Sequence, residues 1–201
     1  MKLFQNFKKF KNQTALINDD GKKFSYGKII DYSKKISKTV KPRSLVLLIT
    51  ENSISSIVSY ISLIKNDCVV IILDVKTPTN NVLELFEKYK PNFVFFPKNW
   101  IDSKRFKDCA HSIKFLNYRV ISNKKANRCK IYTQLSLLLT TSGSMGSAKL
   151  VRLSKKNLFE NARSIKDYLK INNKKRSITT MPTSYSFMIS IINSYIENGA
   201  S

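Results

Sequence analysis

The sequence predicts an α/β protein with a doubly wound, mainly parallel sheet and helices on both of its faces. Two strand-length runs, at 45–49 and 69–73, are apolar throughout, and a third, at 92–96, is apolar after Asn92, which indicates strands that are buried on both sides. Segments with apolar residues at helical spacing separate these runs, and such alternation is typical of parallel sheets. With 201 residues, 42% of them hydrophobic, the chain is long enough to bury a core.

In the first half of the chain, turn residues and apolar periodicity place each expected element. The expected elements are a hairpin of 15–17 and 23–25 turning at 19–21, a helix from about Tyr26 to Val40, a strand at 45–49, a helix with Ile54, Ile57, Val58, Ile61 and Ile64 inward, a strand at 69–73 closed by Asp74, a helix after Pro78, and a strand at 92–96 ended by Pro97.

The second half follows the same rules, with Ser154 as the N-cap of its longest helix. The expected elements are a short helix at 100–107, one strand at 113–121, a basic exposed connection at 122–130, a strand around 137–139, a loop at 140–148, a strand at 150–153, a helix at 155–169, a strand at 177–181 ended by Pro182, and a helix headed by Tyr185.

The net charge of +23 would ordinarily suggest a nucleic-acid or membrane partner. The lysines are scattered along the whole chain, however, and arginine is a small minority of the basic residues. No recognisable nucleic-acid-binding module accompanies the charge, so we attribute it to a compositional bias and expect no specific nucleic acid. A basic nucleic-acid-binding protein remains an alternative.

Cysteine and histidine usage argues against metal and disulfide frameworks. The cysteines, Cys68, Cys109 and Cys129, are odd in number and lack metal-ligand spacing, and Cys68 lies in a run that we expect to be buried. The single histidine, His111, leaves no two-histidine zinc site and no obvious nucleophile–base pair. We expect no metal site, no membrane span or signal peptide, and a cytoplasmic location.

The loop between the two strands around 137–139 and 150–153 is the segment in which we expect a binding site. It combines glycines, which let consecutive N–H groups face one concavity, with hydroxyls and Lys149, which suit the oxygens of a polyanion. The Gly143-x-x-Gly146-x-x-Lys149 spacing matches neither a Walker A loop nor a dinucleotide fingerprint. We therefore expect a nucleotide-phosphate loop between two strands, with an ordinary polar hairpin loop as the alternative.

Thr141-Ser-Gly-Ser-Met-Gly-Ser-Ala-Lys149 resembles the phosphate-binding signature of adenylate-forming enzymes. These include acyl- and aryl-CoA synthetases, luciferases and the adenylation domains of nonribosomal peptide synthetases. The family pattern, Thr-Ser-Gly-Ser/Thr-Thr-Gly-x-Pro-Lys, continues into a strand and Ser-His/Lys-x-Asn-Leu, which stands here as Ser154-Lys-Lys-Asn157-Leu158. Met145 replaces a threonine and Ala148 the proline, so the loop lacks one hydroxyl and one rigid turn residue.

Three further segments resemble the same family. Phe24 to Ile29 is similar to an early Leu-Thr-Tyr-x-Glu-Leu segment, and Leu63 to Asp74 to a Leu-Lys-Ala-Gly segment that continues into a strand, with Asn66-Asp67 in place of Ala-Gly. Pro182-Thr-Ser-Tyr185 is similar to a segment in which an aromatic residue borders the acid pocket. Tyr185 and Met188 also fit the buried face of an amphipathic helix, which we prefer for Met188.

The resemblance implies the N-terminal portion of an AMP-dependent synthetase that activates a carboxylic acid with ATP to an acyl-adenylate, truncated within the large N-terminal domain. Residues 1–130 would form a first subdomain, and residues 131–201 would begin a second. The implied phosphate contacts are Thr141, Ser142, Gly143, Ser144, Gly146 and Lys149, and Tyr185 borders the acid pocket.

The resemblance implies ATP and Mg²⁺ as cofactors, with no metal ligand or catalytic residue among these 201. The implied partners are a carboxylic acid, coenzyme A or a carrier protein as acceptor, and a complementary C-terminal polypeptide for the missing segments. A catalytically inactive truncated or split-gene product that needs such a partner is the alternative.

Overall fold

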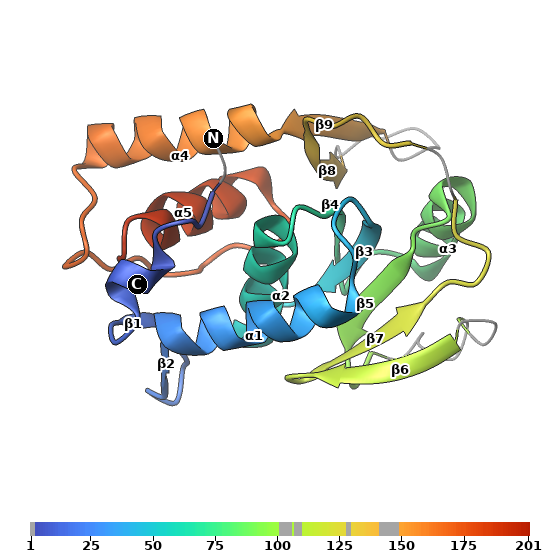
Figure 1. The fold of residues 1–201 in the computed structure, drawn as a ribbon, viewed down its shortest axis with the longest axis horizontal. Coiled ribbons are helices and arrows are strands. Elements are labelled where there is room, and N and C mark those ends of the chain that lie inside the picture. The colour runs from blue at the N-terminus through green and yellow to red at the C-terminus, as the bar shows by residue number, and fades with distance from the viewer. Residues whose placement is uncertain (1–2, 101–105, 107–109, 128–129, 141–148) are drawn as a thin grey trace.

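The computed structural model describes residues 3–100, 106, 110–127, 130–140 and 149–201, arranged as a sheet between helices (Figure 1). In chain order the elements are η1 (Phe7–Phe10), β1 (Thr14–Ile17), β2 (Lys23–Ser25), α1 (Tyr26–Thr39), β3 (Leu45–Thr50), α2 (Ile54–Lys65), β4 (Val69–Asp74), α3 (Thr79–Tyr89), β5 (Phe93–Pro97), β6 (Ala110–Phe115), β7 (Tyr118–Ser122), β8 (Leu135–Thr140), β9 (Leu150–Ser154), α4 (Lys155–Leu169) and α5 (Ser186–Glu197).

The main sheet has seven strands in the order β6-β7-β5-β3-β4-β8-β9. Its four central strands, β5, β3, β4 and β8, run parallel. On one side of them, β7 pairs antiparallel with both β5 and β6, and on the other side β9 pairs antiparallel with β8. The separate β1–β2 hairpin is antiparallel. The predicted α/β class with a mainly parallel sheet is therefore confirmed.

Helices cover both faces of this sheet because alternate residues of each buried strand point to opposite sides. On one face, Val46, Leu48 and Val70 belong to a core shared with α1, α2 and α5. On the other face, Ile49 and Ile71 pack with residues of α3. Both sets of side chains are fully buried, as the continuous apolar runs predicted.

The predicted single strand at 113–121 is wrong, because the chain reverses within it. The structure has two antiparallel strands, β6 and β7, that pair Phe115 with Tyr118. The turn between them holds Leu116 at φ 54°, a left-handed conformation that leucine rarely adopts. Asn117 is a residue type that favours turns, but neither glycine nor proline accompanies it, so the local signal for this turn was weak.

The predicted strand at 177–181 is also wrong. These residues form no strand, and Ile178 is 77% exposed. The backbone near this segment makes two hydrogen bonds with the end of the chain: Ser177 N donates to Ser201 O at 2.8 Å, and Ser201 N donates to Lys175 O at 3.2 Å. Three of these five residues, Ser177, Thr179 and Thr180, are polar, so the segment has little apolar surface to bury in a sheet.

The two ends of the chain pack against each other. Tyr26 is fully buried and its hydroxyl donates to Ile196 O at 3.1 Å and to Ala200 O at 2.6 Å. Burial raises the pKa of this phenol well above its usual value, so it remains a donor. Among the described residues, no helix is long and apolar enough to cross a membrane. The short helix expected at 100–107 lies almost wholly outside the described residues.

Candidate functional site

The β8–β9 hairpin carries the predicted phosphate loop. The two strands are antiparallel, and Thr140 is paired with Leu150 at the end nearest the loop. The expectation that the loop joins two strands, with a helix only after the second, is thus confirmed. Ser154 caps α4 as predicted, since its Oγ accepts from Asn157 N at 3.1 Å and its N donates to Asn157 Oδ1 at 2.9 Å.

Most of the predicted phosphate-binding residues lie outside the described residues, namely Thr141, Ser142, Gly143, Ser144 and Gly146. The structure describes the two ends of the loop. Thr140, the last residue of β8, and Lys149, just before β9, are both exposed. The loop therefore begins and ends at the surface, next to the antiparallel pair.

The loop leaves the sheet at the carboxyl edge of the parallel strands. Thr50 of β3 lies opposite Asp74 of β4, and Ile72 of β4 lies opposite Leu139 of β8, so Thr50, Asp74 and Thr140 end their strands at nearly the same level. Ligands of open α/β sheets bind outside this edge. Thr140, where the predicted phosphate loop begins, therefore lies at this edge of the sheet.

The segment that leads to Tyr185 is attached to the same edge. Thr183 is fully buried, its N–H donates to Asn52 Oδ1 at 3.0 Å, and its hydroxyl lies 3.3 Å from Glu51 O and 3.1 Å from Asn52 Oδ1. Asn52 follows β3 by two residues, so these bonds fix the start of α5 beside the end of the sheet. Sequence analysis missed Thr183 and Asn52, because no local pattern links residues 131 positions apart.

Tyr185 and Met188 have different environments at the head of α5. Tyr185 precedes the first helical residue and is 55% exposed, so its ring does not belong to the buried face of the helix. Met188 is 1% exposed and packs in the core, which confirms the structural interpretation of that residue. Tyr185 and Thr140, where the predicted phosphate loop begins, thus lie at the same edge of the sheet.

A cavity of about 540 Å³ lies between the β8–β9 hairpin, α4 and α5, a size usual for small-molecule sites. Its described lining includes Arg152 from β9, Asn157 and Asn161 from α4, and Ser186 and Asn193 from α5. Ser186 directly follows Tyr185. These side chains offer hydrogen bonds and one positive charge to a small polar ligand.

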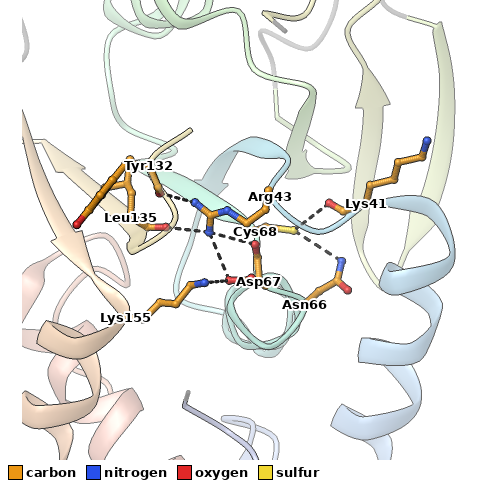
Figure 2. Close-up of polar contacts among 8 residues, drawn as sticks. All are labelled: Lys41, Arg43, Asn66, Asp67, Cys68, Tyr132, Leu135 and Lys155. Carbon is orange, nitrogen blue, oxygen red and sulfur yellow. Dashed lines mark hydrogen bonds and ion pairs between the residues drawn. The ribbon is translucent and has the colours of Figure 1, made fainter. Parts of the chain in front are cut away.

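At the opposite, amino edge of the sheet, a polar network holds the loop-bearing hairpin in place (Figure 2). The Asp67 carboxylate lies between two cations, 2.6 Å from Lys155 Nζ and 3.3 Å from Arg43 Nη1. The Arg43 guanidinium also donates to Leu135 O at 3.0 Å and Tyr132 O at 2.8 Å, whereas its buried Nε has no partner among the described residues. Asp67 therefore connects the β3–β4 side to β8 and α4.

Asp67 adopts φ 61°, the left-handed conformation that favours glycine. This is the position at which the resembled family segment has the glycine of Ala-Gly. The carboxylate thus occupies a backbone site suited to glycine and gains two ion pairs there. Neighbouring Cys68 is fully buried as predicted, and burial raises the pKa of its thiol to about 12, which disfavours reactivity.

The described residues contain no group of three histidine, cysteine, aspartate or glutamate side chains that could hold a metal ion. Asp74 lies at the carboxyl edge, but one of its carboxylate oxygens already accepts from Lys76 N at 2.8 Å.

Comparison with known proteins identifies relatives of the whole chain. A family model described as AMP-binding enzyme matches residues 3–201. No curated protein matches the sequence. Among solved structures, the fold is similar to IdnL1 (TM-score 0.78, 12% identity), to MatB from Rhodopseudomonas palustris (0.74, 17%) and to the O-succinylbenzoate coenzyme A synthetase MenE from Bacillus subtilis in complex with AMP (0.71, 17%).

These similarities cover nearly all of this chain but only part of each neighbour. The matched region includes 98%, 95% and 98% of the present chain, and 41%, 42% and 53% of IdnL1, MatB and MenE respectively. The chain thus spans about half, or less, of the length of the structures that it matches. At these identities the likeness shows the fold.

Proposed function

The chain belongs to the family of AMP-binding enzymes, and from this membership we propose that it is the N-terminal portion of an ATP-dependent ligase that converts a carboxylic acid to an acyl-adenylate. The observation that carries the proposal is the common level at which β3, β4 and β8 end. The glycine- and hydroxyl-rich loop starts at this level, and the segment that leads to Tyr185 is bonded to Asn52 beside it.

In the proposed reaction, a carboxylate oxygen attacks the α-phosphorus of ATP and pyrophosphate leaves. The developing negative charge requires hydrogen-bond donors and cations that are already oriented. Backbone N–H groups and hydroxyls of Thr141, Ser142, Gly143, Ser144 and Gly146 would bind the β- and γ-phosphates. Lys149 would neutralise part of their charge, and Tyr185 would border the acid.

Mg²⁺, when bound, would neutralise phosphate charge, but its ligands and those of adenine and ribose would come from polypeptide beyond these 201 residues. That polypeptide could be continuous with this chain or a separate C-terminal partner. The acceptor of the acyl group would be coenzyme A or a carrier protein. We further propose that residues 1–130 form a first subdomain and that residues 131–201 begin a second.

Calorimetric titration with ATP tests the nucleotide site. We expect the wild-type chain to bind ATP and Lys149→Ala to bind about 10- to 100-fold more weakly, the usual effect of losing one charged hydrogen-bond donor. Gly143→Val should abolish binding, because a branched side chain obstructs a loop in which N–H groups must converge.

Lys156→Ala is the matched control, since Lys156 is an exposed lysine on α4 that immediately follows Lys155. ATP binding equal in the wild type and Lys149→Ala, with both chains folded by circular dichroism, would overturn the phosphate-loop assignment. If Lys156→Ala weakened ATP binding as much as Lys149→Ala does, the loss of affinity would be explained by the change in net charge alone.

Pyrophosphate exchange separates binding from catalysis. If groups for ribose and metal come from elsewhere, the purified 201-residue chain should bind ATP without acid-dependent exchange of labelled pyrophosphate. Exchange by this chain alone would contradict the requirement for further polypeptide. It would leave the ligase proposal in place.

A further inference from the structure

A second cavity, of about 500 Å³, lies between the C-terminal half of α1 and the β5–β7 side of the sheet. Figure 1 shows α1 ending beside these strands, away from α4 and α5. Its described lining shares no residue with the cavity beside α5. It is therefore separate from the site at the carboxyl edge.

The floor of this cavity consists of closely packed apolar side chains. Ile36 and Val40 of α1, Phe95 of β5, Phe115 of β6 and Val120 of β7 form it, and each is at most 5% exposed. The Phe115 ring contacts Phe95 edge-to-face, with ring centroids 6.3 Å apart. Small-molecule sites have such mostly apolar linings and volumes of about 300–1,000 Å³.

The mouth of the cavity is positively charged. Lys35 and Lys38 are exposed residues of α1 that line it, next to Tyr32 and Thr39. Lys35 Nζ lies 4.9 Å from the centroid of the Tyr32 ring, which holds this ammonium group over the opening. None of the described lining residues is acidic.

The end of α1 opposes this charge only weakly. The carbonyl end of a helix carries about half a negative charge, whereas each lysine contributes a full positive one. Asp31 of the same helix lies 3.9 Å from Lys34, which does not line this cavity. The combined field at the mouth therefore favours an anion.

From this arrangement we propose that the cavity binds a small amphipathic carboxylate, a single acid group on an apolar body. The apolar body lies in the opening against the half-buried Tyr32 and Leu116, above the floor of Phe95, Phe115 and Val120. The carboxylate stays at the surface near Lys35 and Lys38. Charge complementarity at the mouth distinguishes this ligand from a neutral or cationic amphiphile of the same length. The inference is independent of the proposed ligase activity, since no residue of the phosphate loop or Tyr185 takes part.

Methyl NMR with octanoate as the probe tests the location. Octanoate should shift the methyl signals of Ile36, Val40 and Val120, and leave those of Leu139 and Ile189, which line the other cavity, unchanged. Octylamine has the same chain with the opposite charge, and it should bind at least about tenfold more weakly. Shifts confined to Leu139 and Ile189, or equal affinity for the two probes, would overturn the proposal.

Charge reversal on α1 provides a matched pair of variants. Lys35→Glu/Lys38→Glu should weaken octanoate binding at least about tenfold. Lys28→Glu/Lys34→Glu changes the net charge of the same helix equally, at exposed positions outside the cavity, and should leave binding within about twofold of the wild type. Equal losses of octanoate affinity in both double variants would be explained by net charge alone, and would overturn the placement of the carboxylate near Lys35 and Lys38.

Vesicles of phosphatidylglycerol distinguish a free acid from a lipid surface. If the ligand is a small carboxylate, the two double variants should lose vesicle co-sedimentation to the same extent, because both carry the same change in net charge. Co-sedimentation that depends on Lys35 and Lys38 alone, without octanoate shifts at Val120, would replace the small carboxylate with a membrane surface and overturn the proposal.

Discussion

Replacing Asp67 with asparagine should destabilise the protein by about 2 kcal/mol. Exposed ion pairs contribute about 0.2–1 kcal/mol, and breaking a buried one costs about 3–5 kcal/mol. The side chains of Arg43, Asp67 and Lys155 are 27%, 23% and 18% exposed, so the cost should fall between these limits. Asparagine adopts φ 61° at least as readily as aspartate, so the change isolates the charge.

Urea unfolding followed by the fluorescence of Trp100, the single tryptophan, measures this cost. For a chain of this size, about 2 kcal/mol corresponds to a fall in melting temperature of about 4–8 °C. Asp67→Ala should cost about 1 kcal/mol more than Asp67→Asn, because alanine adds left-handed backbone strain to the lost ion pairs.

Asp31→Asn is the control, since Asp31 and its partner Lys34 are 70% and 72% exposed and 3.9 Å apart. It should leave the unfolding midpoint nearly unchanged. The Asp67→Asn loss should also persist in 1 M NaCl, because partly buried pairs are screened less than exposed ones. Equal stabilities of Asp67→Asn and the wild type at low salt would refute the role given to the network.

Two other side chains give independent predictions. Tyr118→Phe should lower the free energy of unfolding in urea by about 1–2 kcal/mol, because the buried hydroxyl bonds to Ser56 Oγ and Ile49 O at 2.5 and 2.9 Å. The control is Tyr132→Phe, at a residue that is 72% exposed. Equal unfolding midpoints for the wild type and both variants would contradict this prediction. Burial raises the pKa of Glu197, so its contribution is fully present below the ordinary value of 4.5 and is lost as pH rises through the raised pKa. Urea titrations from pH 4 to 7 should therefore show the wild type losing stability relative to Glu197→Gln, and a constant difference would refute the burial effect.

The strands and helices of the central sheet were predictable because their signals are local. Continuous apolar runs at 45–49 and 69–73 became β3 and β4, and the helix at 155–169 has the predicted bounds because Ser154 and Asn157 form its cap. Each of these signals lies within a few residues of the element that it specifies. The same applies to the α/β class and to the placement of the phosphate loop between two strands.

The errors arise where distant partners decide. The turn at Leu116 depends on β7 pairing with β5, and an alternating pattern cannot show where a strand reverses. Residues 177–181 have two apolar side chains, Ile178 and Met181, and both are exposed, so burial in a sheet does not stabilise a strand there. The bond between Thr183 and Asn52, which attaches α5 to the carboxyl edge, was equally invisible to local reasoning.

The sequence by itself determined the fold class and the family, because apolar periodicity and short motifs are written in neighbouring residues. Only the tertiary structure decided the strand order, the attachment of the Tyr185 segment beside the carboxyl edge of the sheet, and the use of Asp67 as a bridge between Arg43 and Lys155. These depend on packing between segments far apart in the chain, and no residue carries a local signal of its distant partner.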